Sequence, residues 1–219
     1  MKHSLFCKIP TLAVAVLLCA MSAFAQNGAD AFNRQGLGTT WVTTAGSLTI
    51  TNHQMAGSSG SLGYLKAASK AKAASAVLFL TSTDLEYGAV ALGNIGAGNN
   101  AFVKLQAQDG TQTFTNGAFY TGNNGGGTFF ALSSPVPSPA VLDVFFCGTV
   151  ATMRITSAAG VQTYTNDYGA TFGAGAGLGT YGSVGLDNFV GSAGGCNHMQ
   201  VHGTPASKMP RAIDPTVGK

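Results

Sequence analysis

Apolar and polar residues alternate with a period of two along much of the chain, and turn residues separate the alternating segments. Leu48 and Ile50 share one face of such a segment, and Val103 and Leu105 share one face of another, with Lys104 between them. Successive side chains of a strand point to opposite faces, so this pattern predicts half-buried strands. Other segments alternate in the same way or are more continuously apolar, as central strands are; they lie at residues 76–80, 87–92, 142–146, 152–156, 161–165 and 184–187.

The connections between these segments favour an antiparallel arrangement. Asp109-Gly110 is a strong hairpin-turn signal, and Thr111 to Phe114 begins a return strand. Residues 65–76 are rich in Ala and Lys but lack an amphipathic stripe, so we expect a loop there with at most one helical turn. Many short strands without a crossover helix predict an all-β fold, an antiparallel sandwich or barrel, with little or no helix outside the amino-terminal leader.

The amino-terminal residues have the organisation of a secretory signal peptide. Lys2 and Lys8 precede an apolar run over residues 12–18, which is followed by Ala23-Phe24-Ala25. A basic start, a short apolar stretch and an A-x-A site predict cleavage before Gln26 and a secreted, extracellular or periplasmic protein. The run is shorter than the roughly 20 residues that span a bilayer. No later apolar run is long enough either, so we expect no transmembrane segment after cleavage.

Composition narrows the range of partners. Without Lys2 and Lys8 the chain keeps nine basic and eight acidic residues, which makes it nearly neutral. No basic stripe is available to neutralise phosphates, which argues against a nucleic-acid partner. The 31 glycines are consistent with tight turns between many short strands.

Two cysteines remain after residues 1–25 are removed. Cys147 and Cys196 form an even pair in an oxidising compartment, which predicts a disulfide between a central strand and the end of the domain. We therefore expect one domain over residues 26–196, a length sufficient for a single hydrophobic core. Residues 197–219 contain three prolines and no apolar periodicity, so we expect a disordered tail.

Two regions carry a resemblance to a known family. The segment DAFNRQGLGTTWVTTAGSLTITNHQMAG, residues 30–57, contains D-x-F, then a tryptophan and G-S-L-x-I, and the segment GTYGSVGLDNF, residues 179–189, closes with G-L-D-N-F. Over roughly residues 30–192 the chain resembles the concanavalin A-like lectin/glucanase superfamily, particularly its LamG-like jelly rolls. The resemblance implies two curved antiparallel sheets packed face to face, with the first and last strands side by side. Lectins, carbohydrate-binding modules, glucanases and adhesion domains share this fold, and many carry a structural calcium ion.

The catalytic motif of the family's glucanases is absent from the chain. Those enzymes use E-x-D-x-x-E or E-x-D-x-E, whose two glutamates act as nucleophile and acid/base about 5–5.5 Å apart. Glu86 is the single glutamate of this sequence, so no catalytic residue is predicted, although an aspartate pair stays open. We expect Asp84 and Glu86 to lie in a solvated turn.

Candidate sugar-binding residues are aromatic rings beside amides. Tyr120, Asn123, Asn124 and Tyr168 combine rings that stack on sugar faces with amides that bond hydroxyls. Trp41 falls just before a strand and is expected in the core, because its large ring supplies much buried area.

Calcium binding and function follow from the resemblance. Asp30 and Asp187 would lie on adjacent strands and are the candidate ligands of a structural calcium ion. The sequence favours a secreted, non-catalytic binding module for a glycan or another cell-surface ligand. Two alternatives stay open: a divergent glycoside hydrolase of the same fold, and a purely structural surface protein.

Overall fold

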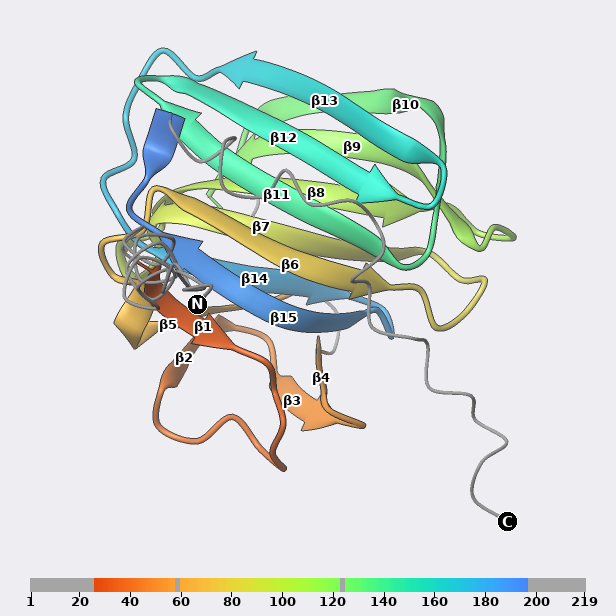
Figure 1. Ribbon diagram of the computed structural model, residues 1–219, viewed down its shortest axis with the longest axis horizontal. Coiled ribbons are helices and arrows are strands. Elements are labelled where there is room, and N and C mark those ends of the chain that lie inside the picture. The colour runs from red at the N-terminus through yellow and green to blue at the C-terminus, as the bar shows by residue number, and fades with distance from the viewer. Residues whose placement is uncertain (1–25, 58–59, 123–124, 197–219) are drawn as a thin grey trace, which may run out of the picture.

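A computed structural model of the protein shows two antiparallel β-sheets packed face to face (Figure 1). It describes residues 26–57, 60–122 and 125–196. The predicted signal peptide and the predicted tail lie outside the described residues, as do Asn123 and Asn124. The predicted all-β sandwich is confirmed.

Eight strands form the first sheet, which is nearer the viewer in Figure 1. In the order β13-β12-β11-β6-β15-β4-β3, with β1 also paired to β15, they are β13 (Gly160–Asp167), β12 (Val150–Ser157), β11 (Ala140–Cys147), β6 (Ala73–Phe79), β15 (Gly185–Ser192), β4 (Gln54–Gly57), β3 (Leu48–Thr51) and β1 (Gln26–Asp30).

Seven strands form the second sheet, which lies behind the first in the same view. In the order β10-β9-β8-β7-β14-β5-β2, they are β10 (Gly127–Pro137), β9 (Thr113–Thr121), β8 (Asn99–Ala107), β7 (Glu86–Asn94), β14 (Ala176–Tyr181), β5 (Ser61–Leu65) and β2 (Trp41–Ala45).

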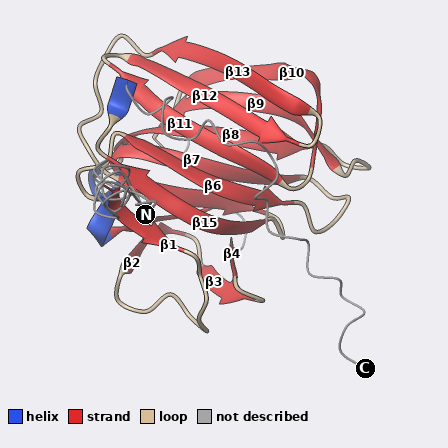
Figure 2. Cartoon of the chain, viewed as in Figure 1, coloured by secondary structure: helices blue, strands red, loops and turns tan. Residues whose placement is uncertain are grey.

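Strands dominate the described ranges, and helical structure there consists of short 3₁₀ turns, two of which are elements between strands (Figure 2). These two are η1 (Lys66–Ala68) and η2 (Ile95–Ala97). The single helical turn expected within residues 65–76 is η1, whereas residues 73–76 of that segment belong to β6. Neither turn is long or apolar enough to cross a membrane.

The core lies between the two sheets. Leu78, Leu142 and Met153 of the first sheet and Val90 and Leu105 of the second are fully buried in one apolar cluster. Full burial of each large apolar side chain stabilises the fold by roughly 1.5–3 kcal/mol. The period-two pattern is therefore confirmed as the alternation between a core face and an outer face.

The first and last strands lie side by side, as the resemblance implied. β1 pairs antiparallel with β15, which places Asp30 opposite Phe189. Trp41 packs against this junction, with its ring centroid 5.7 Å from that of Phe32 and 5.3 Å from that of Phe189. Only 5% of Trp41 is exposed, so its expected place in the core is confirmed.

The predicted disulfide is present. Cys147, the last residue of β11, is bonded to Cys196, with their Cα atoms 4.7 Å apart. The bond joins β11 to the end of the described chain, beyond β15. It closes a loop that contains β12, β13, β14 and β15.

Candidate functional site

Aromatic side chains gather on the outer face of the seven-stranded sheet. Phe102 forms an apolar cluster with Tyr87 and Tyr120 that is separate from the main core. The register places Ala89 and Ala118 on either side of Lys104 across the sheet, and Phe129 beyond Ala118. We call this surface the outer aromatic face and define it by Tyr87, Phe102, Lys104, Tyr120, Phe129 and Tyr181.

Lys104 lies among three of these rings. Its Nζ is 4.5 Å from the ring centroid of Tyr87, 5.2 Å from that of Tyr120 and 5.8 Å from that of Phe129. Each cation–π contact contributes on the order of 0.5–1 kcal/mol. The ammonium group also donates a hydrogen bond of 2.8 Å to Gln106 Oε1, and burial lowers the pKa of Lys104.

A stacked pair of tyrosines extends this cluster to β14. Tyr87 and Tyr181 are paired in the strand register, and their rings stack at 5.4 Å with an interplanar angle of 17°. Phe102 meets Tyr87 edge to face at 6.1 Å. Burial, together with the neighbouring Tyr181 and Tyr120, raises the pKa of Tyr87.

Tyr181 also forms part of the wall of a groove at one end of the sandwich. The groove has a volume of about 540 Å³, and Asp84, Leu85, Asp109 and Ser183 line it with Tyr181. Asp84, Asp109 and Ser183 are exposed. The groove therefore offers an aromatic ring, two carboxylates and a hydroxyl to a ligand, at the point where it meets the outer aromatic face.

Glu86 holds together two of the loops that shape this groove. It is fully buried, and its carboxylate accepts hydrogen bonds of 3.1 Å from Thr81 N–H, from the Ser82 hydroxyl and from Ser183 N–H. The expectation of a solvated turn is wrong for Glu86, because it begins β7 and points inward where donors of two loops converge. Asp84, two residues earlier, is exposed as expected.

Of the residues predicted to bind sugar, Tyr120 lies on the outer aromatic face and Tyr168 does not. The Tyr168 ring packs against Phe146 at 5.9 Å and Phe172 at 4.9 Å, and burial raises its pKa well above the ordinary value. Its hydroxyl donates a 3.2 Å hydrogen bond to the backbone carbonyl of Tyr120. Tyr168 thus supports the strand that carries Tyr120, and Asn123 and Asn124 lie outside the described residues.

Asp30, one of the two predicted calcium ligands, is already bonded to protein donors. It forms a bidentate ion pair with Arg34 at 2.6 Å and accepts hydrogen bonds from Trp41 Nε1 at 2.7 Å and Phe32 N–H at 2.8 Å. Burial alone would raise the pKa of Asp30, but the bonds from Arg34, Trp41 and Phe32 outweigh it and lower the pKa. A calcium ion bound to Asp30 would have to displace the Arg34 guanidinium.

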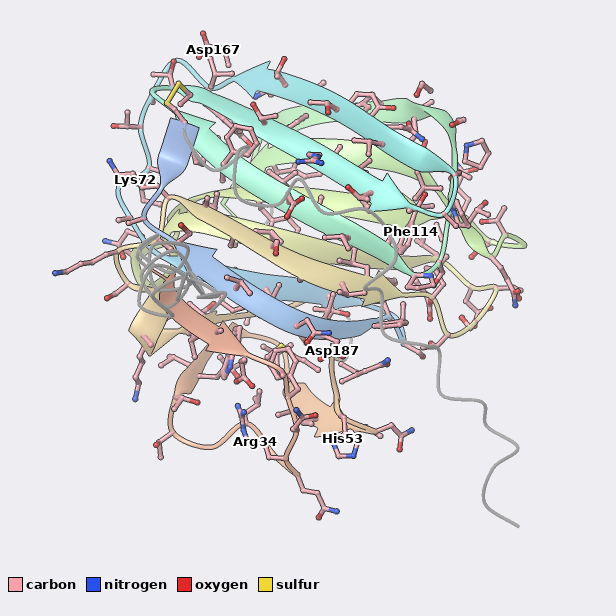
Figure 3. The ribbon with its side chains drawn as sticks, viewed as in Figure 1. Arg34, His53, Lys72, Phe114, Asp167 and Asp187 are labelled. Atoms are coloured by element: carbon pink, nitrogen blue, oxygen red, sulfur yellow. A yellow bond between two sulfur atoms is a disulfide. The ribbon has the colours of Figure 1, made fainter. Side chains whose placement is uncertain are left out.

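Asp187 lies near Asp30, on the side of the molecule that also carries His53 and Arg34 and far from Asp167 (Figure 3). Burial raises the pKa of Asp187, and the charge of Asp30 adds to the rise, although the Asn188 hydrogen bond and the His53 charge oppose it. Across the part of the chain that the structure describes, no three His, Cys, Asp or Glu side chains gather as a metal site. Calcium at Asp30 and Asp187 stays a prediction.

Sequence reasoning did not single out Lys104, Tyr181 or Asp109 as site residues. The alternation places Lys104 on the face of its strand opposite to that of Val103 and Leu105. This predicts that Lys104 faces outward, but it does not predict that Lys104 binds a ligand. Asp109 is recognisable only as a turn residue, and Tyr181 only as part of the closing segment.

Comparison with known proteins finds similarity in fold and none in sequence that identifies a family. No protein-family model matches the sequence, and no curated protein matches it. Among solved structures, a family 66 carbohydrate-binding module from Bacillus subtilis aligns with a TM-score of 0.51 at 16% identity, over 70% of this chain and 96% of the module. The likeness is one of fold: the chain shares the two-sheet jelly-roll sandwich of this module, as the resemblance to concanavalin A-like proteins implied.

Two enzymes have a similar fold. A β-1,3-1,4-glucanase (lichenase) derived from a mouse hindgut metagenome aligns with a TM-score of 0.53 at 6% identity, over 76% of this chain and 98% of the enzyme. Porphyranase B from Zobellia galactanivorans aligns with a TM-score of 0.51 at 10% identity, over 77% and 91%. Identities this low show the fold and leave the activity to be argued from the site.

Proposed function

We propose that this concanavalin A-like jelly roll binds glycans through the groove and the adjoining outer aromatic face. The observation that carries the proposal is the place of Tyr181, which lines the groove with Asp84 and Asp109 and also stacks on Tyr87. A tyrosine ring supplies a flat apolar surface for a sugar face, and carboxylates accept hydrogen bonds from sugar hydroxyls. A carbohydrate-binding module among the structures of similar fold is consistent with this use of the fold.

A hydrolytic role is the second candidate, because Asp84 and Asp109 line the same groove. Glycoside hydrolysis needs one carboxyl held protonated and one ionised, on either side of the scissile bond. Glu86 is fully buried against Thr81, Ser82 and Ser183 and does not line the groove. We therefore favour binding, and release of reducing ends from a bound glucan that stops in Asp84→Asn or Asp109→Asn would establish the enzyme instead.

Removing the Tyr181 ring is expected to weaken glycan binding about tenfold or more. The Tyr181→Ala variant loses the aromatic wall of the groove, and aromatic residues dominate binding energies in well-packed sites. A glycan array identifies the oligosaccharide, and calorimetry with that oligosaccharide compares the variant with the wild type.

The carboxylates are tested in the same assay with a matched control. Asp84→Asn and Asp109→Asn should each weaken binding, whereas Asp167→Asn, an equal change at an exposed aspartate outside the groove, should leave it unchanged. If Asp84→Asn, Asp109→Asn and Tyr181→Ala all bind the glycan as tightly as the wild type does, the groove is refuted as the binding site. A wild-type protein that captures no glycan would favour a purely structural surface role.

We also propose that the protein is exported. The Cys147–Cys196 disulfide supports an oxidising compartment, and the amino-terminal residues supply the signal-peptide pattern. Mass analysis of the protein recovered from the periplasm or medium is expected to find Gln26 as the first residue. Recovery of exported protein that still begins at Met1 would contradict cleavage.

A further inference from the structure

Lys104 is a half-buried cation on the outer aromatic face that has no counter-ion among the described residues. Its strand neighbours across the sheet are Ala89 and Ala118, whose small side chains leave the ammonium group room among the surrounding rings. Within the described ranges, no carboxylate forms an ion pair with it. Its only hydrogen-bond partner there is Gln106 Oε1, at 2.8 Å.

The other side chains that the strands direct to this face near Lys104 are neutral. The adjacent positions of β7, β8, β9 and β10 hold aromatic, amide or small residues: Tyr87, Phe102, Gln106, Asn116, Tyr120 and Phe129. The exposed carboxylates of the site, Asp84 and Asp109, line the groove with Tyr181, whose ring stacks on Tyr87. The face therefore carries a single positive charge between the rings, and its negative charges lie at the groove.

This placement favours binding of an anion by the Lys104 ammonium group. Burial removes part of its hydration, and ring faces compensate a cation less completely than a carboxylate or sulfate does. A charged acceptor within reach would form a charge-assisted hydrogen bond, which is about twice as strong as a neutral one. Phe129, which is 49% exposed, and Tyr120 border Lys104 and present apolar surface to a sugar ring beside it.

We propose that Lys104 selects acidic glycans, pairing with the carboxylate or sulfate of a sugar residue held against Tyr120 and Phe129. This inference rests on the proposed function, since it extends a glycan from the groove past the Tyr87–Tyr181 stack onto the rest of the outer aromatic face. Neither the groove nor the fold by itself determines a preference for acidic glycans.

The test compares wild type with Lys104→Met on three oligosaccharides of matched length: one with uronate residues, one with sulfate esters and one neutral. Methionine keeps the unbranched stem among the rings and removes the charge. We expect Lys104→Met to lose about tenfold or more in affinity for one of the acidic oligosaccharides, and to bind the neutral one as the wild type does. The wild-type affinity for that acidic oligosaccharide should also fall as salt rises.

Two further variants serve as controls. Lys104→Arg keeps the positive charge and should retain more of the acidic-glycan affinity than Lys104→Met. Lys70→Met makes the same chemical change at an exposed lysine between η1 and β6 and should change nothing. Thermal unfolding of each variant confirms that it is folded.

The outcomes separate this inference from the proposed function. If Lys104→Met binds every acidic oligosaccharide as tightly as the wild type does, while Tyr181→Ala still weakens binding, the role of Lys104 is overturned and the proposed glycan binding stands. Loss of neutral and acidic binding together in a folded Lys104→Met also overturns it, because charge selection is then absent. Failure of the wild type to bind any oligosaccharide refutes both.

Discussion

Replacing Glu86 with alanine is expected to lower the free energy of unfolding by about 3 kcal/mol or more. The carboxylate accepts from two backbone N–H groups, those of Thr81 and Ser183, and from the Ser82 hydroxyl. Alanine leaves these part-buried donors without their acceptor, and each donor that water cannot reach then costs about 1–3 kcal/mol. Urea unfolding of the two proteins measures the difference.

Two variants make this prediction specific. Glu86→Gln keeps the side-chain shape, but its amide group faces donors, so we expect an intermediate loss of stability. Asp84→Asn neutralises an exposed carboxylate in the same loop and should stay within about 0.5 kcal/mol of wild type. A Glu86→Ala protein as stable as Asp84→Asn would show that the buried carboxylate does not hold the loops.

Replacement of Glu86 also links the stability of the fold to the binding site. Thr81 and Ser82 belong to the loop that precedes β7, and Ser183 lines the groove with Tyr181. Loosening this junction should therefore weaken glycan binding, although Glu86 itself does not line the groove. A loss of affinity in Glu86→Gln reports the shape of the groove, and it is not a sign of a catalytic carboxyl.

Removal of the disulfide is the second change with a large expected effect. Cys147 and Cys196 are 49 residues apart in sequence, and closing a loop of that length restricts the unfolded chain by about 4 kcal/mol. For a domain of this size the loss corresponds to a fall in Tm of roughly 10 °C. The double variant Cys147→Ser/Cys196→Ser, compared with wild type by thermal unfolding, gives the value.

A reductant provides the matched control. Both cysteines are exposed, so a thiol reductant should lower the Tm of the wild type and leave that of the double variant unchanged. Equal Tm values for oxidised wild type and double variant would contradict a stabilising bond.

The strands show how much of the secondary structure the local sequence pattern predicts. Val103 and Leu105 alternate with Lys104, and β8 buries the first two while turning Lys104 outward. Residues 73–76 were expected in a loop because they are alanines and a serine, with no alternation to detect. They are strand because β11 and β15 pair with β6 on both sides, which only the assembled sheet supplies.

The disulfide was predictable for a different reason. Once residues 1–25 are taken as a signal peptide, two cysteines remain, so the pairing follows from their number. Glu86 was misjudged because its neighbours in sequence are polar turn residues, whereas its donor Ser183 lies 97 residues away. A hydrogen-bond partner at that separation leaves no trace in the local pattern.

The sequence by itself determined the fold class, the disulfide pairing and the resemblance to the concanavalin A-like jelly rolls. These depend on side-chain periodicity, on the number of cysteines and on short motifs, none of which requires the order of strands in the sheet. The tertiary structure alone decided that Tyr87 and Tyr181 stack, that Lys104 lies among Tyr87, Tyr120 and Phe129, and that Asp84 and Asp109 line one groove. The Tyr87–Tyr181 contact joins strands distant in the chain, whereas the contacts of Lys104 join side chains of the consecutive strands β7 to β10. The order and the register of the strands in the sheet bring these side chains together.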